Sequence, residues 1–412
     1  SMDDLAPPGT LACPACGGSS LERQWNVFDV WLDSGSTQRA VLEDRDDLSW
    51  PADVVLEGGD QYRGWFNSLL TLGCATRATA PYRTVVTNGW VLDGQGRPMH
   101  KSLGNVVDPF QLVDRYGADV LRLWVAASDY RSDVRISMEH MDQVAEVYRK
   151  LRNTFRFCLG NLYDYTPPEG EPPVSGDVLD LWAMAALSEL LTDLKAHYEA
   201  FEYHAVVQVL QSFVTGELSS FYLDVIKDRL YTRAPDDPLR RGTQATLHRL
   251  ATAIARVVAP ILPFTADEMW AAIPGRDGHV TSQLWPEVPD LPPHARARAA
   301  EVDQVLRVRQ PALLALEELR REHVIGNSLE AALVIEAPAG IREVLERLSE
   351  HLPEWLMVAR VELRDAPELA VRAIREEGVV KCSRCWRSLP AAEIDQESVC
   401  RRCRSVLATL PA

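Results

Sequence analysis

Long hydrophobic runs are missing from this chain of 412 residues, because none reaches the roughly 18 apolar residues that a membrane-spanning helix needs. No signal-peptide pattern and no internal repeat are visible. Positive charge is scarce: 43 Lys and Arg residues against 59 Asp and Glu residues give a net charge of −16. Phosphate contacts need local positive charge, so this balance argues against indiscriminate nucleic-acid binding. We expect a cytoplasmic protein of about two to four domains, without a membrane or DNA partner.

The eight cysteines do not form the pattern of a disulfide framework, since six of them lie in C-x-x-C pairs. Two pairs near the C-terminus are separated by 14 residues, a spacing that allows four thiolates to close a tetrahedral structural Zn²⁺ site. The predicted ligands are Cys382, Cys385, Cys400 and Cys403. Another pair, Cys13 and Cys16, is only half of such a site. It is either a metal-free remnant, the interpretation we favour, or is completed by other residues.

Hydrophobic periodicity changes along the chain. Between 54 and 127, short β-branched runs alternate with helix-like stretches, which is typical of α/β folds. Long amphipathic stretches follow, and a Pro-rich linker at 286–293 leads to a predicted strand at 332–336. The predicted helices are 138–161, 177–199, 203–231, 244–258 and a shorter one near 265–272. We predict a multidomain α/β plus α protein with segments 1–137 (α/β), 138–286 (helical bundle), 294–378 (small α/β junction) and 379–412 (four-cysteine module).

The segment 93–105, D-G-Q-G-R-P-M-H-K-S-L-G-N, resembles the mobile ATP loop of the class I aminoacyl-tRNA synthetases, whose signature is K-M-S-K-S. Lys101 and Ser102 match that signature, whereas Pro98 and His100 replace its first lysine and first serine. A lost donor to developing phosphate charge costs about 2–4 kcal/mol of transition-state stabilisation. Use of ATP by this chain is therefore doubtful.

Further segments, in order and at similar spacing, resemble the C-terminal half of a bacterial isoleucyl-tRNA synthetase. They are D-V-W-L-D-S-G-S-T (29–37), L-E-G-G-D-Q-Y-R-G-W-F-N-S-L-L (56–70), Y-R-K-L-R-N-T-F-R-F (148–157), S-S-F-Y-L-D-V-I-K-D-R-L-Y (219–231) and A-P-I-L-P-F-T-A-D-E-M-W (259–270). The resemblance implies half of a Rossmann-type catalytic domain followed by an anticodon-binding bundle and a zinc ribbon. The family's H-I-G-H motif and editing insertion are not found in this sequence. The chain is either a truncated paralogue or a fragment.

The resemblance also implies a site for the aminoacyl group. The segment with Glu57 and Asp60 would follow a strand end, where ligands collect in open α/β sheets. Alternatively, these two carboxylates cap the following helix. Candidate substrate-binding residues are Trp31, Glu57, Gly58, Asp60, Gln61, Asn88, Gly89, Lys101 and Ser102. Candidate catalytic residues are Asp60, His100 and Lys101, although for His100 we favour the alternative of a solvated loop residue.

Two groups of basic residues could contact tRNA, although ordinary solvated arginines would look the same. They are Arg149, Lys150, Arg152 and Arg156, and, around the cysteines, Arg384, Arg387, Arg401 and Arg402, with the aromatic Trp386 among them. Our leading hypothesis is a protein that binds tRNA(Ile) and transfers isoleucine from Ile-tRNA to a small-molecule acceptor without ATP, because an aminoacyl ester is already activated. The alternatives are a fragment of an ATP-dependent isoleucine–tRNA ligase and a non-catalytic tRNA-binding protein.

Overall fold

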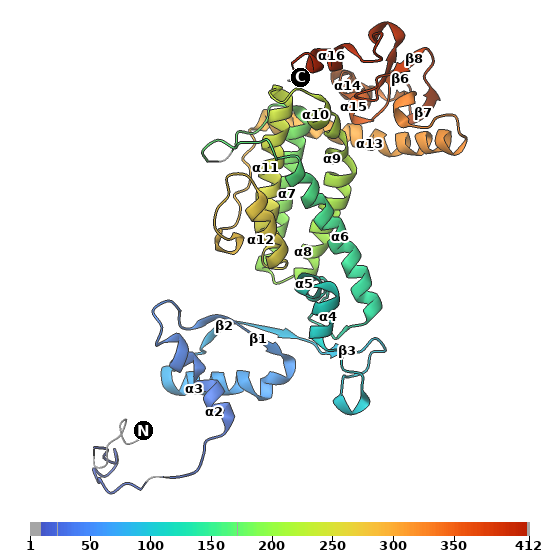
Figure 1. Ribbon diagram of the computed structural model, residues 1–412. Helices are drawn as coiled ribbons and strands as arrows, with labels where there is room; N and C mark the ends of the chain where they lie inside the picture. Colours follow the sequence, from blue (N-terminus) through green and yellow to red (C-terminus); the bar gives the residue numbers. More distant parts are fainter. Residues whose placement is uncertain (1–9, 23, 171, 410–412) are drawn as a thin grey trace. The chain divides into compact units, whose positions relative to one another are not determined.

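The computed structural model describes residues 10–22, 24–170 and 172–409. The start of the predicted segment 1–137 and the end of the predicted segment 379–412 therefore lie outside the described residues. The chain forms two compact units (Figure 1). One contains the chain up to Val91 together with Tyr130–Val134, and the other contains Leu92–Asp129 and everything from Arg135 onward.

The first unit is built around a parallel strand pair joined by a helix. Val54 pairs with Thr84, and Gly58, at the end of its strand, pairs with Asn88. A small core of Val55, Phe66 and Leu69 lies between strand and helix. The elements are α2 (Val30–Thr37), the π-helix η1 (Gln38–Leu42), β1 (Ala52–Gly58), the 3₁₀ turn η2 (Gly59–Arg63), α3 (Trp65–Arg77) and β2 (Tyr82–Asn88). The short β-branched runs expected after residue 54 are strands here, since 54–56 lies in β1 and 84–87 lies in β2.

The chain then forms a two-stranded sheet, a loop and two helices. The loop occupies 93–105, and Asp108 caps the helix after it by accepting a 2.9 Å hydrogen bond from the Phe110 amide. These elements are β3 (Val91–Leu92), η3 (Lys101–Leu103), α4 (Pro109–Tyr116), α5 (Ala118–Ala127) and β4 (Val134–Arg135).

A helical bundle forms the body of the second unit (Figure 1). Three of its helices begin at polar caps. The side chain of Asp177 accepts from the amides of Leu179 and Asp180 at the start of one helix. Ser137 and Asp237 cap two others in the same way, through amides of their own helices. The helices are α6 (Met138–Gly160), α7 (Val178–Glu199), α8 (Tyr203–Ser212), the π-helix η4 (Phe213–Tyr222), α9 (Leu223–Val225), α10 (Lys227–Thr232), α11 (Pro238–Val258), α12 (Pro263–Ala272) and the 3₁₀ turn η5 (Val280–Ser282).

Two expectations about the bundle were wrong in detail. The stretch 203–231 is not one continuous helix, because a π-helical segment interrupts it at Phe213–Tyr222. The helix predicted at 244–258 begins six residues earlier, at Pro238, where proline is tolerated in the first turn because that turn needs no amide donor.

The junction segment contains a 29-residue helix that the sequence pattern did not predict, α13 (Pro293–Arg321), with Pro311 inside it. Its residues Val302, Val305 and Val308 are fully buried in the same hydrophobic core as the bundle. A three-stranded sheet of order β6-β5-β7 follows, parallel between β5 and β6 and antiparallel between β5 and β7. The remaining elements are η6 (Ser328–Glu330), β5 (Ala331–Ala337), α14 (Ala339–Arg347), α15 (Leu352–Trp355), β6 (Arg360–Asp365) and β7 (Ala370–Arg375).

The chain closes with a small module around the four cysteines. Its elements are the antiparallel strands β8 (Val379–Lys381) and β9 (Ser388–Pro390), the turn η7 (Ala391–Glu393) and α16 (Arg401–Leu407). Across the described part of the chain, none of the helices combines the length and apolar character that crossing a bilayer requires.

Candidate functional site

Four predicted substrate-binding residues meet at the carboxyl ends of β1 and β2. Parallel register sets Glu57 beside Thr87 and Gly58 beside Asn88, with Gly89 directly after. A Cβ on Gly58 would lie 2.6 Å from Asp60 Oδ1, so the glycine lets the following turn fold back closely. The strand pairing therefore gathers polar groups where ligands collect in open α/β sheets.

The turn after β1 also places Gln61 and Trp31. The N-cap residue of α3 is Gly64, and the side-chain oxygen of Gln61 accepts a 3.0 Å hydrogen bond from the amide of Trp65, the first helical residue. The alternative that Glu57 and Asp60 cap this helix is therefore wrong. A Cβ on Gly64 would approach the Trp31 ring to 2.7 Å and the Gln61 oxygen to 2.6 Å. The indole ring thus packs against this turn while remaining half exposed.

The loop 93–105 is held by two side chains that sequence reasoning missed, Asp93 and Asn105. The Asp93 carboxylate accepts hydrogen bonds from the amides of Gln95 and Arg97, the Arg97 Nε and the Asn105 Nδ2, each at 2.9 Å. The Asn105 and Arg97 donors keep the pKa of Asp93 well below its usual range. Asn105 also donates to the Pro98 carbonyl at 3.0 Å and accepts from the His100 amide at 2.9 Å.

These bonds latch both ends of the loop while leaving its signature side chains in solvent. His100, Lys101 and Ser102 are exposed. The sequence could have indicated this arrangement, because the Gly-rich loop begins with an Asp and ends with an Asn. Both side chains readily form hydrogen bonds with backbone groups. The loop and the strand-end group belong to different units.

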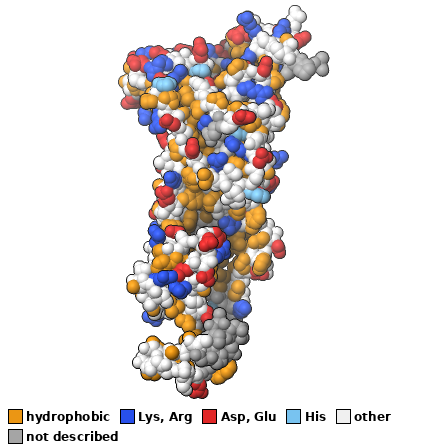
Figure 2. All heavy atoms as spheres, turned by 90° about the vertical axis from the view of Figure 1, so that its left-hand side faces the viewer, with side chains coloured by type: hydrophobic (Ala, Val, Ile, Leu, Met, Phe, Trp, Pro, Cys, Tyr) orange, Lys and Arg blue, Asp and Glu red, His pale blue; other side chains and the backbone are white. Residues whose placement is uncertain are grey.

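The predicted basic residues on α6 differ in how they are engaged. Arg149 pairs with Glu146 at 2.7 Å and Arg152 with Glu268 at 3.3 Å, whereas Lys150 and Arg156 are exposed. On the face that Figure 2 shows, basic and acidic side chains are interspersed. Two cavities flank α6, of about 470 and 570 Å³, and the larger includes Arg152 and Arg156 in its lining.

The four C-terminal cysteines come together as predicted, with all sulfur atoms within 4.8 Å of one another. The sulfurs of Cys385 and Cys400 are 3.8 Å apart, close to the edge of about 3.8 Å that a tetrahedron with Zn–S bonds of about 2.3 Å has. Although burial opposes it, backbone amide donors lower the pKa of Cys382 to about 6, while burial raises the pKa of Cys385 and Cys400. This donor set fits zinc, which would neutralise the buried thiolates and hold the two knuckles together.

Two predicted RNA-contacting arginines of this module are engaged with α10. Arg402 donates to both carboxylate oxygens of Asp228, at 2.6 and 2.7 Å, and to the Thr232 hydroxyl at 3.1 Å. Arg384 donates to the Thr232 carbonyl. Burial raises the pKa of Asp228, but the Arg402 guanidinium outweighs it and the pKa is lowered. Both arginines therefore dock the module on the bundle.

The other predicted residues of the module face outward. Arg401 is exposed, Arg387 is partly exposed, and Trp386 is 57% exposed with the Lys381 ammonium 5.0 Å from its ring centre.

At the other end of the chain, a turn around Cys13 is closed by a 2.8 Å hydrogen bond from the Gly17 amide to the Cys13 carbonyl. Among the described residues no third potential metal ligand joins the Cys13–Cys16 pair.

Comparison with known proteins identifies the two main parts of the chain. Residues 8–137 match the family "tRNA synthetases class I (I, L, M and V)", and residues 180–335 match "Anticodon-binding domain of tRNA ligase". A leucyl synthetase from Agrobacterium radiobacter K84, solved with tRNA and LeuAMS, has a similar fold, with a TM-score of 0.52 over 89% of this chain and 38% of that one at 17% identity. Residues 8–137 are thus a class I tRNA synthetase segment, and residues 180–335 are an anticodon-binding domain.

Within that class, the chain is similar to isoleucine–tRNA ligases from several bacteria. Those of Syntrophotalea carbinolica, Geobacillus thermodenitrificans and Thermotoga maritima are 42%, 43% and 40% identical over 98%, 98% and 97% of this chain. The matched region is 45% of each relative, so the chain spans about half their length and corresponds to their C-terminal half.

Proposed function

We propose that the chain is the tRNA-binding half of an isoleucine–tRNA ligase, which attaches isoleucine to tRNA(Ile) with ATP when the remaining half of the catalytic domain is present. The observation that carries this proposal is identity of 40–43% along 97–98% of the chain with isoleucine–tRNA ligases. This reading replaces ATP-independent transfer as the leading hypothesis.

The first unit supports the proposal, because apolar side chains on its two parallel strands are left exposed to solvent. Parallel strands normally have both faces covered, yet Val54, Leu56 and Val85 are 41%, 53% and 38% exposed. Nearby in sequence, Val27 and Phe28 are 95% and 75% exposed. We propose that these surfaces pack against the part of an isoleucine–tRNA ligase that this chain does not cover.

In this proposal the strand-end group binds the isoleucyl part of the intermediate. Trp31 offers an apolar wall, and the carboxylates of Glu57 and Asp60 can accept hydrogen bonds from an ammonium or ribose hydroxyls. The amide of Gln61 provides both donor and acceptor. Lys101 and Ser102 are placed on a loop suited to phosphate contacts, where charge stabilisation is worth about 2–4 kcal/mol per donor. Zinc has a structural role.

The test supplies the missing half in trans. The N-terminal half of one of the similar isoleucine–tRNA ligases is co-expressed with the chain, and isoleucine-dependent exchange of pyrophosphate into ATP is measured. We expect exchange from the pair only, and its loss in Asp60→Asn. The matched control is Asp53→Asn, which removes an exposed carboxylate at the opposite end of β1. No exchange from a soluble, stably associated pair would refute the proposal.

ATP-independent transfer of isoleucine to a small amine remains a second candidate because Pro98 and His100 replace two residues of the synthetase signature. Ile-tRNA labelled in the isoleucine is incubated with the chain and a cell extract without ATP. Label that appears in a small molecule only with protein supports transfer. Label that stays on tRNA rejects it, and tRNA binding without either activity would leave a non-catalytic binding protein.

A further inference from the structure

A groove on the bundle is formed by two helical stripes that face each other. On α6, Lys150, Thr154 and Phe157 recur at helical spacing. Along η4, α9 and α10, every fourth residue from Thr215 to Lys227 lines the groove. Such spacing puts the members of each stripe on one face of a helix. The groove has a volume of about 470 Å³, and its lining residues are Lys150, Asn153, Thr154, Phe157, Thr215, Ser219, Leu223 and Lys227.

The floor of the groove is a fixed pair of hydroxyls. The Oγ1 of Thr154 lies 2.8 Å from the Oγ of Ser219, and either hydroxyl can be the donor. When Ser219 donates, the Thr154 hydroxyl can donate to the Lys150 carbonyl at 3.1 Å. The Thr154 residue is only 5% exposed. This bond ties the two helices together beneath the groove and sets the distance between its walls.

The groove offers hydrogen-bond donors and no carboxylate. Its ammonium groups come from two separate elements, Lys150 on α6 and Lys227 on α10, and the Asn153 amide is a further polar group of the lining. Lysine is scarce in this chain, with five residues among 43 basic ones, and two of the five line this groove. One acidic neighbour, Asp224, pairs with Lys227 at 2.7 Å, and it also attracts Arg309.

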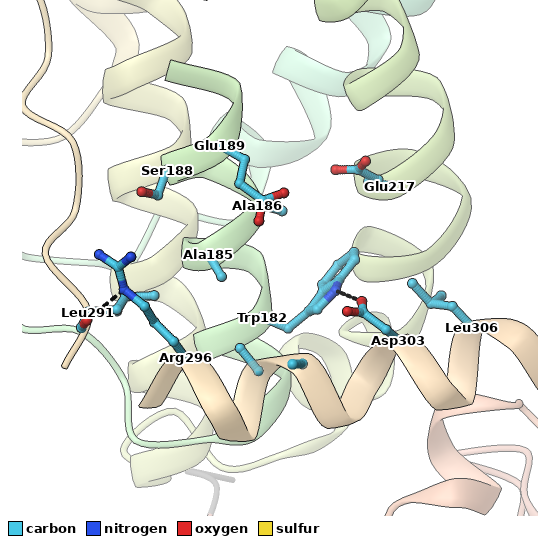
Figure 3. A pocket seen from close by; sticks show the side chains of 12 residues that line it. Trp182, Ala185, Ala186, Ser188, Glu189, Glu217, Leu291, Arg296, Asp303 and Leu306 are labelled. Carbon is cyan, nitrogen blue, oxygen red and sulfur yellow. Dashed lines mark hydrogen bonds between the residues drawn. The ribbon is translucent and has the colours of Figure 1, made fainter. Parts of the chain in front are cut away.

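Another cavity of the bundle has the opposite chemistry. The cavity of about 250 Å³ between α7, η4 and α13 has three carboxylates in its lining, those of Glu189, Glu217 and Asp303 (Figure 3). There the Asp303 carboxylate accepts a 3.2 Å hydrogen bond from the Trp182 indole. That cavity also contains Arg296, so its carboxylates outnumber its one cation, whereas the groove of about 470 Å³ has two ammonium groups and no carboxylate in its lining. Of these two sites, the groove is the one that favours an anion.

We propose that the groove between α6 and η4–α10 binds a backbone phosphate of the tRNA. This inference rests on the proposed function for the identity of the partner and adds Lys227 and the groove to the predicted contacts. A lysine ammonium is a compact point charge that suits phosphate oxygens, and phosphate contacts position RNA without reading its bases. The groove therefore contributes affinity equally to all tRNAs and leaves discrimination to other residues.

The test compares two double variants of the full chain that lose the same charge. Lys150→Ala/Lys227→Ala empties the groove of ammonium groups. Lys195→Ala/Arg321→Ala removes exposed side chains outside it. Binding of a labelled tRNA(Ile) transcript and of a non-cognate transcript is measured from 50 to 200 mM KCl, after circular dichroism has shown that both variants are folded.

We expect the groove variant to bind both transcripts about tenfold or more weakly, with a salt slope reduced by about 1 per lost contact. The control should stay within about twofold of wild type, and Lys150→Arg/Lys227→Arg should keep the wild-type slope. Equal affinity and slope in the groove and control variants overturns the groove while leaving tRNA binding intact. Wild-type protein that binds no tRNA overturns the proposed function and the groove together.

A second arm separates RNA phosphate from free phosphate. Binding of inorganic phosphate is measured by calorimetry for wild type and the groove variant at constant ionic strength. Phosphate binding that the groove variant abolishes, without any change in its tRNA affinity, assigns the groove to free phosphate and overturns the RNA proposal.

Discussion

The perturbation with the largest predicted effect on stability is Arg229→Met, because this guanidinium is completely buried among three carboxylates. Arg229 donates to Asp177 at 2.7 Å and to Glu354 at 2.8 Å, and lies 3.9 Å from Asp180. Asp180 is itself fully buried and accepts a 2.7 Å hydrogen bond from the Tyr222 hydroxyl. Methionine fills similar volume but leaves the carboxylates without a cation.

The magnitude follows from the burial of the unpaired charges. Breaking a buried pair by removing one partner costs about 3–5 kcal/mol. Burial raises the pKa of Asp180 to about 6, although Arg229 opposes this, and without Arg229 the pKa must rise further. A folded-state pKa above the unfolded value of about 3.9 means that the contribution of Asp180 is full below that value and is lost as pH rises through about 6. The variant should therefore lose less stability at pH 5 than at pH 7.

The assay is chemical unfolding followed by circular dichroism, at pH 5 and pH 7. Arg320→Ala is the control, since this exposed arginine pairs with its helix neighbour Glu317 and should change stability by less than about 0.5 kcal/mol. Adding Asp180→Asn to Arg229→Met should recover part of the loss. The predicted role of Arg229 would be refuted if Arg229→Met lost unfolding free energy within about 1 kcal/mol of the control at pH 7. It would also be refuted if the loss were equal at pH 5 and pH 7.

Three further predictions concern the module and the loop. The chain should purify with one zinc ion, and Cys382→Ser should lose it and raise amide exchange throughout the four-cysteine module; metal-free protein with the same protection would contradict this. Asp228→Asn should keep the metal but weaken docking by about 1.5–3 kcal/mol, because it removes a charged acceptor of Arg402, and unchanged exchange in the module would argue against that role. Asn105→Ala should speed tryptic cleavage after Lys101 by about tenfold, since it releases the latched loop; wild-type cleavage rates would mean that the latch does not restrain it.

Secondary structure was predictable where local patterns and caps agree. The helix expected at 177–199 is observed at Val178–Glu199, with Asp177 as its cap, and the strand expected at 332–336 is observed at Ala331–Ala337. The π-helix at Phe213–Tyr222 was not predictable, because its i→i+5 bonds leave the sequence pattern of an α-helix almost unchanged. The helix Pro293–Arg321 was missed because Pro311 reads as a helix breaker.

The site shows the same division between local and distant information. The cysteine cluster follows from spacing alone, because each C-x-x-C knuckle is a local turn. By contrast, Arg402 was read as an RNA contact because its partner Asp228 lies 174 residues away in the chain. Periodicity carries no information about such pairs, so charged residues near a motif cannot be assigned to solvent, partner or fold without coordinates.

The motif V-I-K-D-R-L-Y gains a physical explanation from α10. Lys227, Asp228 and Arg229 are consecutive, and successive residues of a helix point about 100° apart. Lys227 therefore lines the groove beside α6, Asp228 receives Arg402 of the four-cysteine module, and Arg229 enters the core to meet Glu354 of the junction segment. One helical turn fixes three parts of the unit at once. If the groove binds an RNA phosphate as we propose, the phosphate at Lys227 and the four-cysteine module at Asp228 are held by adjacent residues. Loosening this turn should weaken tRNA binding and module docking together.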